Sequence, residues 1–345
     1  MNPSLDQRES PWPHRLAVAL VCATFPMIWI GGLVTTYGAG MAVPDWPNTY
    51  GYNLFLYPWQ TWVYGPFKLF IEHGHRLFGT LVGMIAIAFL VSTWCCQRRA
   101  NLRWLGAAAL IGVVAQGALG GLRVLADEVQ IAKIHGIVGP VFFAFTVALA
   151  SITSRRWQSA KRSEERQLGA IERLGVITTL LVFLQLVLGA QLRHLSPEAP
   201  LGNFRLALFF HLAVAVALLA HVFMLAARVL YSHRQESWLA RPAVGLLVML
   251  LVQIGLGAGS WVTNYGFPVW LSRYDFAAAY VPVADGAVQA WTTTAHVALG
   301  SLILATSLML TLRSMRLSSP LSARFAPSKP ATSPSQRILS MGAGL

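Results

Sequence analysis

Four histidines at matching positions are the residues of this sequence best suited to do chemistry. His75, His135, His211 and His296 each lie near the start of every second apolar segment, at comparable depth. A single such histidine could serve interhelical hydrogen bonding, but an ionisable residue in a membrane segment is costly, and four at matched depth indicate function. Because a haem iron takes two axial ligands, which facing helices can supply, two pairs of imidazoles predict two haem sites.

Other uses of the histidines fit the spacing less well. Zinc normally takes three or four ligands with tighter local spacing, which the sequence lacks. A proton relay would bring more intramembrane carboxylates than the one present. The repeat described below predicts that His75 pairs with His135 and that His211 pairs with His296.

The segment Glu72-His73-Gly74-His75-Arg76 adds a carboxylate and a guanidinium beside the first histidine. Glu72 precedes His75 by three residues and therefore shares its helical face. Its carboxylate can orient the imidazole or act on a group bound at the iron. The alternative is an interface ion pair with Arg76 at i+4, worth about 0.5 kcal/mol or less. We expect His73 to point away from the site, into water.

Arginines near the predicted outer boundary suit haem propionates, because guanidinium matches the geometry of a carboxylate. The candidates are Arg76, Arg123, Arg193, Arg205 and Arg273. The alternative is that they anchor helix ends at the membrane interface.

Long apolar runs must position these residues. Only 11% of the 345 residues are charged and the mean hydropathy is +0.56, whereas soluble domains carry about 25% charged residues. About 18 apolar residues are needed to cross a hydrocarbon core about 30 Å thick. Runs of that kind cover residues 16–36, 75–96, 104–122, 133–153, 173–192, 206–227, 242–262 and 290–312. The sequence predicts an all-α integral membrane protein with eight transmembrane helices, and it excludes a soluble globular protein.

The basic residues report topology. Of the 26 Lys and Arg residues, 19 fall in the two ends and the even-numbered connections, and the net charge of +13 resides there. By the positive-inside rule, both termini are predicted to be cytoplasmic. These charges need no nucleic acid to explain them. The N-terminal leader has no transit-like character, which favours a bacterial plasma membrane.

A repeat divides the chain. A Gln-x-x-Leu-Gly motif ends three of the predicted helices, at Gln116–Gly120, Gln185–Gly189 and Gln253–Gly257, and the first helix ends in Gly31-Gly32. The glycines suggest close helix packing, which leaves the glutamines unexplained. We predict two tandem four-helix bundles related by a pseudo-two-fold axis along the membrane normal. The expected parts are an N-terminal half, 1–153, a cytoplasmic linker, 154–172, a C-terminal half, 173–312, and a disordered tail, 313–345.

Together these features resemble the haem A synthase family. The resemblance rests on the two four-helix halves, one outer histidine per even helix, the Glu72-x-x-His75-Arg76 opening, and the glycine-rich end of the first helix followed by Val43-Pro44-Asp45-Trp46-Pro47. It extends over residues 14–312.

The resemblance implies an oxidoreductase that converts the C8 methyl of haem O into the formyl group of haem A, for haem-copper terminal oxidases. It implies haem b as cofactor on His211 and His296, substrate haem on His75 and His135 with Arg76 nearby, and Glu72 as the catalytic carboxylate. It also implies contact with a haem O synthase and an electron donor. We further expect contact with membrane lipid and no binding of nucleic acid. A homo-oligomer is left open.

Two features of the first outer loop depart from the pattern or remain open. Some bacterial members have a cysteine pair there, but residues 37–71 contain no Cys, which excludes a disulfide-based electron route. The loop is also aromatic, and either a lid over the substrate haem or interface anchoring explains this equally well.

Three other functions stay open at this point. A di-haem b-type electron-transfer cytochrome without haem-modifying activity would use the same four histidines but would not need Glu72. A transporter would use the histidines and glutamines as a polar pathway. An assembly factor without chemistry of its own would tolerate loss of Glu72.

Overall fold

Eight long helices make up most of this computed structural model, which describes residues 10–162, 166–196 and 198–318. Each is long and apolar enough to cross a membrane. They are α1 (Trp12–Thr36), α3 (Phe67–Cys96), α4 (Ala100–Ala126), α5 (Val129–Ile152), α7 (Arg166–Arg193), α8 (Leu201–His233), α9 (Ser237–Tyr265) and α11 (Ala287–Leu317). The prediction of an all-helical, multi-pass membrane protein is confirmed.

In the part of the chain that the structure describes, four short helices lie in the connections and were not predicted. They are α2 (Trp59–Val63), α6 (Arg155–Ser159), the 3-10 helix η1 (Val269–Leu271) and α10 (Asp275–Ala278). Each has only three to five residues, far fewer than a helix needs to cross a membrane, so a search for long apolar runs does not detect it.

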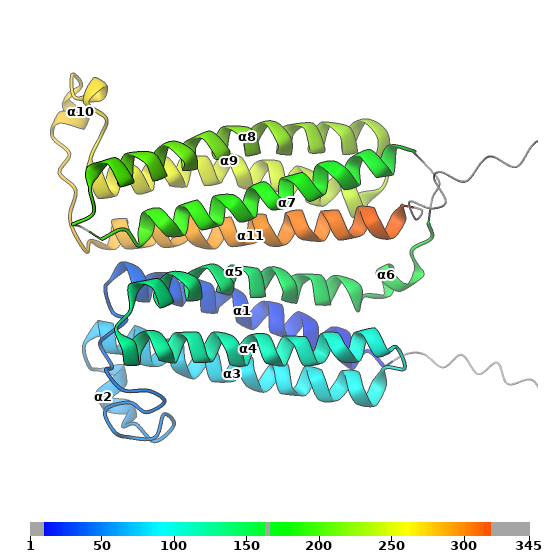
Figure 1. The fold of residues 1–345 in the computed structure, drawn as a ribbon, viewed down its shortest axis with the longest axis horizontal. Coiled ribbons are helices and arrows are strands. Elements are labelled where there is room, and N and C mark those ends of the chain that lie inside the picture. The colour runs from blue at the N-terminus through cyan, green and yellow to red at the C-terminus, as the bar shows by residue number, and fades with distance from the viewer. Residues whose placement is uncertain (1–9, 163–165, 197, 319–345) are drawn as a thin grey trace, which may run out of the picture.

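The long helices pack in two groups (Figure 1). In the first group α1 contacts α3, α3 contacts α4, α4 contacts α5, and α5 returns to α1. In the second group α7 contacts α8, α8 contacts α9, α9 contacts α11, and α11 returns to α7. The groups meet where α11 lies against α1 and α5. Helices α3 and α5 are therefore diagonal across the first group, as α8 and α11 are across the second.

The start of α1 and the end of α11 lie at one end of the molecule, together with α6 (Figure 1). Arg316 at the end of α11 donates to the Trp157 carbonyl in α6 at 3.2 Å, and His14 in α1 is 3.2 Å from the Thr153 hydroxyl. We call this the inner end. The opposite, outer end carries α2 and α10. Eight crossings thus return the chain to its starting side.

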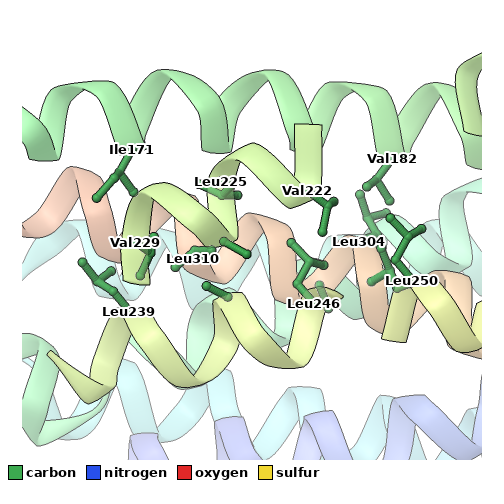
Figure 2. Packing of buried hydrophobic residues seen from close by; sticks show 14 of the residues in the cluster. Ile171, Val182, Val222, Leu225, Val229, Leu239, Leu246, Leu250, Leu304 and Leu310 are labelled. Atoms are coloured by element: carbon green, nitrogen blue, oxygen red, sulfur yellow. The ribbon is translucent and has the colours of Figure 1, made fainter. Parts of the chain in front are cut away.

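The buried apolar core of each group lies toward the inner end. In the second group it includes Ile171, Val222, Leu246 and Leu310, whose side chains converge between the helices in Figure 2. The first buried members on the four histidine-bearing helices are Val82, Phe142, Leu218 and Ile303. Each of these follows its histidine by seven residues, or about 10 Å along the helix. The histidines lie beyond these two clusters, and a third, smaller cluster packs at the outer end of the first group, formed by Leu33, Val34, Ala39 and Ile71.

Helix boundaries differ from the apolar runs. Helix α3 begins at Phe67, eight residues before the predicted run, and α7 begins at Arg166, within the predicted linker. Residues 313–317, predicted as the start of the tail, belong to α11, where Arg313 donates to the Trp238 carbonyl at 3.0 Å. Apolar runs mark the hydrocarbon core, whereas helical hydrogen bonding continues into the interface. The rest of that tail, from residue 319, lies outside the described residues.

Candidate functional site

The structure brings the four predicted histidines together in the two expected pairs. The ring centroids of His75 on α3 and His135 on α5 are 6.4 Å apart, with planes at 79°. Those of His211 on α8 and His296 on α11 are 6.5 Å apart, with planes at 62°. Each pair spans a diagonal of its helix group, so the two imidazoles face each other across the interior.

This spacing fits one metal atom between the rings. A metal–imidazole bond is about 2.0 Å long and the ring centroid lies about 1.1 Å behind the bonding nitrogen, so two imidazoles on one metal have centroids about 6.2 Å apart. The Nδ1 atoms of His75, His135 and His211 are buried without a hydrogen-bond partner. That of His296 lies 3.2 Å from the Gln253 carbonyl oxygen. The other ring nitrogen of His211, Nε2, lies 3.2 Å from the amide nitrogen of Gln185.

Two facing side chains are a ligand set that a haem iron can take from a protein. Among the described residues, no three His, Cys, Asp or Glu side chains converge as a metal-ion site would require. Two cavities lie at the inner end, one beside His233 and Arg234 and the other beside His14 and Arg15, and neither includes a paired histidine. The residues present therefore suit a flat, two-ligand group between diagonal helices better than a compact multi-ligand ion.

A glycine on the preceding long helix contacts each of the four imidazoles. A Cβ atom added to that glycine would lie 3.1–3.4 Å from the Cε1 atom of the histidine. The pairs are Gly31 with His75, Gly120 with His135, Gly189 with His211 and Gly257 with His296. The glycines were predicted to allow close packing of helices. The structure shows that the group packed against each of them is a histidine ring.

The motif glutamines hold the backbone at the same histidines. The carboxamide of Gln116 donates to the His135 carbonyl at 3.3 Å, that of Gln185 to the His211 carbonyl at 3.0 Å, and that of Gln253 to the His296 carbonyl at 2.9 Å. Sequence reasoning left these glutamines unexplained. Each glutamine precedes its motif glycine by four residues, which places the two on one helical face. That spacing is the sequence feature that could have linked the glutamines to the histidines.

Glu72 and Arg76 fasten the first outer loop to α3. One oxygen of Glu72 accepts the backbone N–H of Val43 at 2.9 Å, and the other accepts from Arg76 at 2.9 Å. Arg76 also donates to the carbonyls of Val43, Asp45 and Asn48, at 2.6–2.8 Å. Both side chains are nearly enclosed, with 4% and 10% of their surfaces exposed. The i, i+4 ion pair foreseen as the alternative is present, and it is part of a larger network.

Asp45 organises the same loop from within. Its carboxylate accepts the backbone N–H groups of Tyr50 at 2.8 Å and Gly51 at 2.7 Å. Burial acts to raise its pKa, but these hydrogen bonds and the nearby Arg76 outweigh burial, so the pKa of Asp45 lies below its ordinary value.

The expectation that His73 points into water is wrong. His73 is 2% exposed, its Nδ1 lies 3.0 Å from the Thr49 hydroxyl, and its ring packs on Tyr57 and Trp62. The first outer loop folds over it, which the sequence could not show because the contact joins residues far apart in the chain. His73 therefore supports the loop from below.

The arginines predicted near the outer boundary have different surroundings. Arg193 on α7 donates to the Gly32 carbonyl at 2.8 Å and to the Thr36 hydroxyl at 2.7 Å, so it links the two helix groups. Arg123 lies directly against Gly40, where no Cβ would fit. Arg273 lies over the Tyr274 ring, and Arg205 is exposed. Arg76 and Arg123 lie near Glu72 and are the ones placed close to the His75 pair.

Comparison with known proteins gives one family match. A family model described as cytochrome oxidase assembly protein matches residues 14–197, more than half of the chain. The matched range includes Glu72, His75, Arg76 and His135, and it ends just before α8, which carries His211. A search of curated proteins gives no match.

Proposed function

The chain belongs to the haem A synthase family of cytochrome oxidase assembly proteins, and from this premise we propose that it oxidises the C8 methyl of haem O to the formyl group of haem A. Its family gives it a role in cytochrome oxidase assembly. The proposed reaction makes it an oxidoreductase of the monooxygenase type, with haem O as substrate and haem b as cofactor. Two successive hydroxylations, each taking one oxygen atom from dioxygen and releasing the other as water with two electrons from the donor and two protons, give a geminal diol that loses water to leave the formyl group.

The observation that carries this proposal is the spacing of the two imidazole pairs, 6.4 and 6.5 Å between centroids. Each distance is close to the separation of about 6.2 Å expected for two imidazoles bound to one metal atom. We assign His211 and His296 to haem b, and His75 and His135 to the substrate haem. When bound, haem b supplies one-electron redox chemistry.

The residues of the chain then have distinct tasks. The four imidazoles hold the two iron atoms across diagonal helices, and the contacting glycines keep each ring against its neighbouring helix. Glu72 shares the helical face of His75 one turn nearer the outer end, so its carboxylate can accept a proton near the substrate. Arg76 holds Glu72 in place and keeps the loop closed over α3, which excludes water from that side.

A second candidate is a di-haem b-type electron-transfer cytochrome without haem-modifying activity. One observation favours it: both oxygens of Glu72 already have hydrogen-bond partners, Val43 and Arg76. Such a carboxylate can be purely structural. The two candidates share all four histidines and differ in whether Glu72 is needed for chemistry.

The proposal also includes the setting of the protein. We propose two tandem four-helix bundles related by a pseudo-two-fold axis along the membrane normal, in a bacterial plasma membrane, with both termini cytoplasmic. The shared inner end of α1 and α11 and the excess of Lys and Arg there support this orientation. A haem O synthase and an electron donor are the proposed partners, and a homo-oligomer is compatible with the fold.

The test is pigment analysis of the purified protein. The protein is isolated from cells that also make haem O, and its pigments are extracted and separated by chromatography with mass detection. Haem B together with haem O, a hydroxylated form or haem A is the expected result. Haem B alone at two per chain indicates the electron-transfer cytochrome. Folded protein without haem contradicts both assignments.

A further inference from the structure

The contacts at the histidines form a three-part unit that recurs along the chain. In three of the four units a glutamine donates to the histidine carbonyl and a glycine four residues later contacts the imidazole. In two of these, α4–α5 and α9–α11, a glycine four residues after the histidine also faces the glutamine. In the α4–α5 unit a Cβ added at Gly139 would lie 3.1 Å from the Gln116 amide nitrogen. In the α9–α11 unit one added at Gly300 would lie 3.2 Å from that of Gln253.

The unit formed by α1 and α3 differs at one position. Gly31 contacts His75 as the other glycines contact their histidines, and Gly79 follows His75 by four residues. A Cβ added at Gly79 would lie 3.1 Å from the terminal methyl of Met27. Met27 precedes Gly31 by four residues and so occupies the glutamine position. A thioether has no N–H to donate, so the carbonyl of His75 receives no hydrogen bond from this position.

We propose that Met27 is a positioning residue that makes His75 the most readily released of the four axial ligands, so that the haem on His75 and His135 can exchange. This inference rests on the proposed function. The haem on His211 and His296 is held by two units with a glutamine, Gln185 and Gln253, and is retained.

The physical basis is the stiffness of the helix pair at the histidine. A hydrogen bond from a side chain of one helix to the carbonyl of the next fixes their separation at that level, and so limits how far the imidazole can retreat from the iron. One neutral hydrogen bond changes an equilibrium by about two- to tenfold. Methionine is flexible and fills the same space without that restraint.

The proposed reaction requires the two haems to differ in how readily they dissociate. A cofactor must stay bound over many turnovers, whereas a substrate haem must enter and its product must leave. A site with one restrained and one unrestrained axial histidine meets the second need. The histidine pairs are alike in centroid spacing and glycine contact. The second pair has two further contacts: Nε2 of His211 lies 3.2 Å from the Gln185 amide nitrogen, and Nδ1 of His296 lies 3.2 Å from the Gln253 carbonyl oxygen.

The experiment measures the release of haem B from the full-length protein loaded with haem B at both sites. Excess apomyoglobin captures released haem, and the absorbance change gives the rate. We expect two phases, and the His75→Ala variant identifies the faster one as the His75–His135 site. Met27→Gln should slow that phase by about two- to tenfold. Met27→Leu, which changes shape but adds no donor, is the matched control and should leave the rate within twofold.

The reciprocal variant tests the same idea at the other site. Gln253→Met should speed the slow phase by a similar factor and should let carbon monoxide bind the reduced haem, because carbon monoxide takes the axial position that the imidazole leaves. A merely structural role would not produce this spectral change. If Met27→Gln behaves as Met27→Leu does, or if Gln253→Met changes neither the slow phase nor carbon monoxide binding, the inference is overturned while the proposed function stands. If the unmodified protein takes up no haem B, both are overturned.

Discussion

The carboxylate of Glu72 accepts a hydrogen bond from the backbone N–H of Val43 at 2.9 Å, across 29 residues of sequence. The residue proposed for catalysis therefore also fixes the first outer loop. Any substitution at Glu72 acts on both, so the variants that test it must separate charge from loop anchoring.

Glu72→Gln separates them. The amide keeps one acceptor oxygen for Val43 but removes the negative charge. We expect the loop to stay closed and haem to stay bound, while formyl production falls at least a hundredfold, as loss of a general base predicts. The measurement is haem A formed per bound haem. Glu72→Ala, which removes both functions, is the comparison, and a fully active Glu72→Gln enzyme would leave the carboxylate without a chemical role.

Arg76→Lys tests the anchoring of the loop. Lysine keeps the charge but cannot reach the carbonyls of Val43, Asp45 and Asn48 together, since it lacks the planar fork of arginine. We expect chymotrypsin to cleave the loop at least about tenfold faster, because cleavage follows the population of the open form. Exposed Tyr50 and Tyr52 are the expected sites.

The control for the loop is Arg205→Lys, since Arg205 is exposed and lies on α8. It should leave cleavage of the first outer loop unchanged. Equal cleavage rates in the two variants would mean that Arg76 does not hold the loop.

His211→Ala or His296→Ala should abolish retained haem b. On the proposed assignment, removing either ligand would leave the iron with one protein bond and would open the space between α8 and α11. The haem b content of purified protein, measured as the pyridine complex, gives the result. His221→Ala is the control, because His221 lies ten residues further along α8, about 15 Å deeper. Unchanged haem b in both ligand variants would refute the assignment.

Gly257→Ala tests the contact between glycine and imidazole. The new methyl would lie 3.1 Å from Cε1 of His296, so the ring must shift and haem b retention should fall by about tenfold, as overpacking costs on the order of 1–3 kcal/mol. Gly255→Ala on the same helix meets nothing within 4 Å. It gains the same helix propensity and should retain haem b, so equal losses in both variants would rule out the contact as the cause.

Periodicity and hydropathy predicted much of this structure. The eight spans and the pairing of His75 with His135 followed from apolar runs and from a repeat along one chain. The site of His73 did not, because its burial depends on Thr49, Tyr57 and Trp62 meeting it through the fold of a loop. Loop contacts of this kind have no sequence period.

The role of the glutamines could be predicted only in part. The spacing of Gln253 from Gly257 was visible in the sequence, but the acceptor, the His296 carbonyl, lies 43 residues away on another helix. Met27 carried no signal at all by residue type. Only its place opposite Gly79 identifies it as the counterpart of the glutamines.

The buried cores that begin seven residues beyond each histidine contain none of the four paired histidines, so their packing does not depend on what the histidine pairs bind. The inner end can hold the helices together whether or not the outer end is filled. Under the proposed function, newly made chains would therefore be expected to fold in the membrane before haem reaches them. The amount of loaded protein would then report how much haem the cell delivers, and the total amount of protein would not change with that delivery.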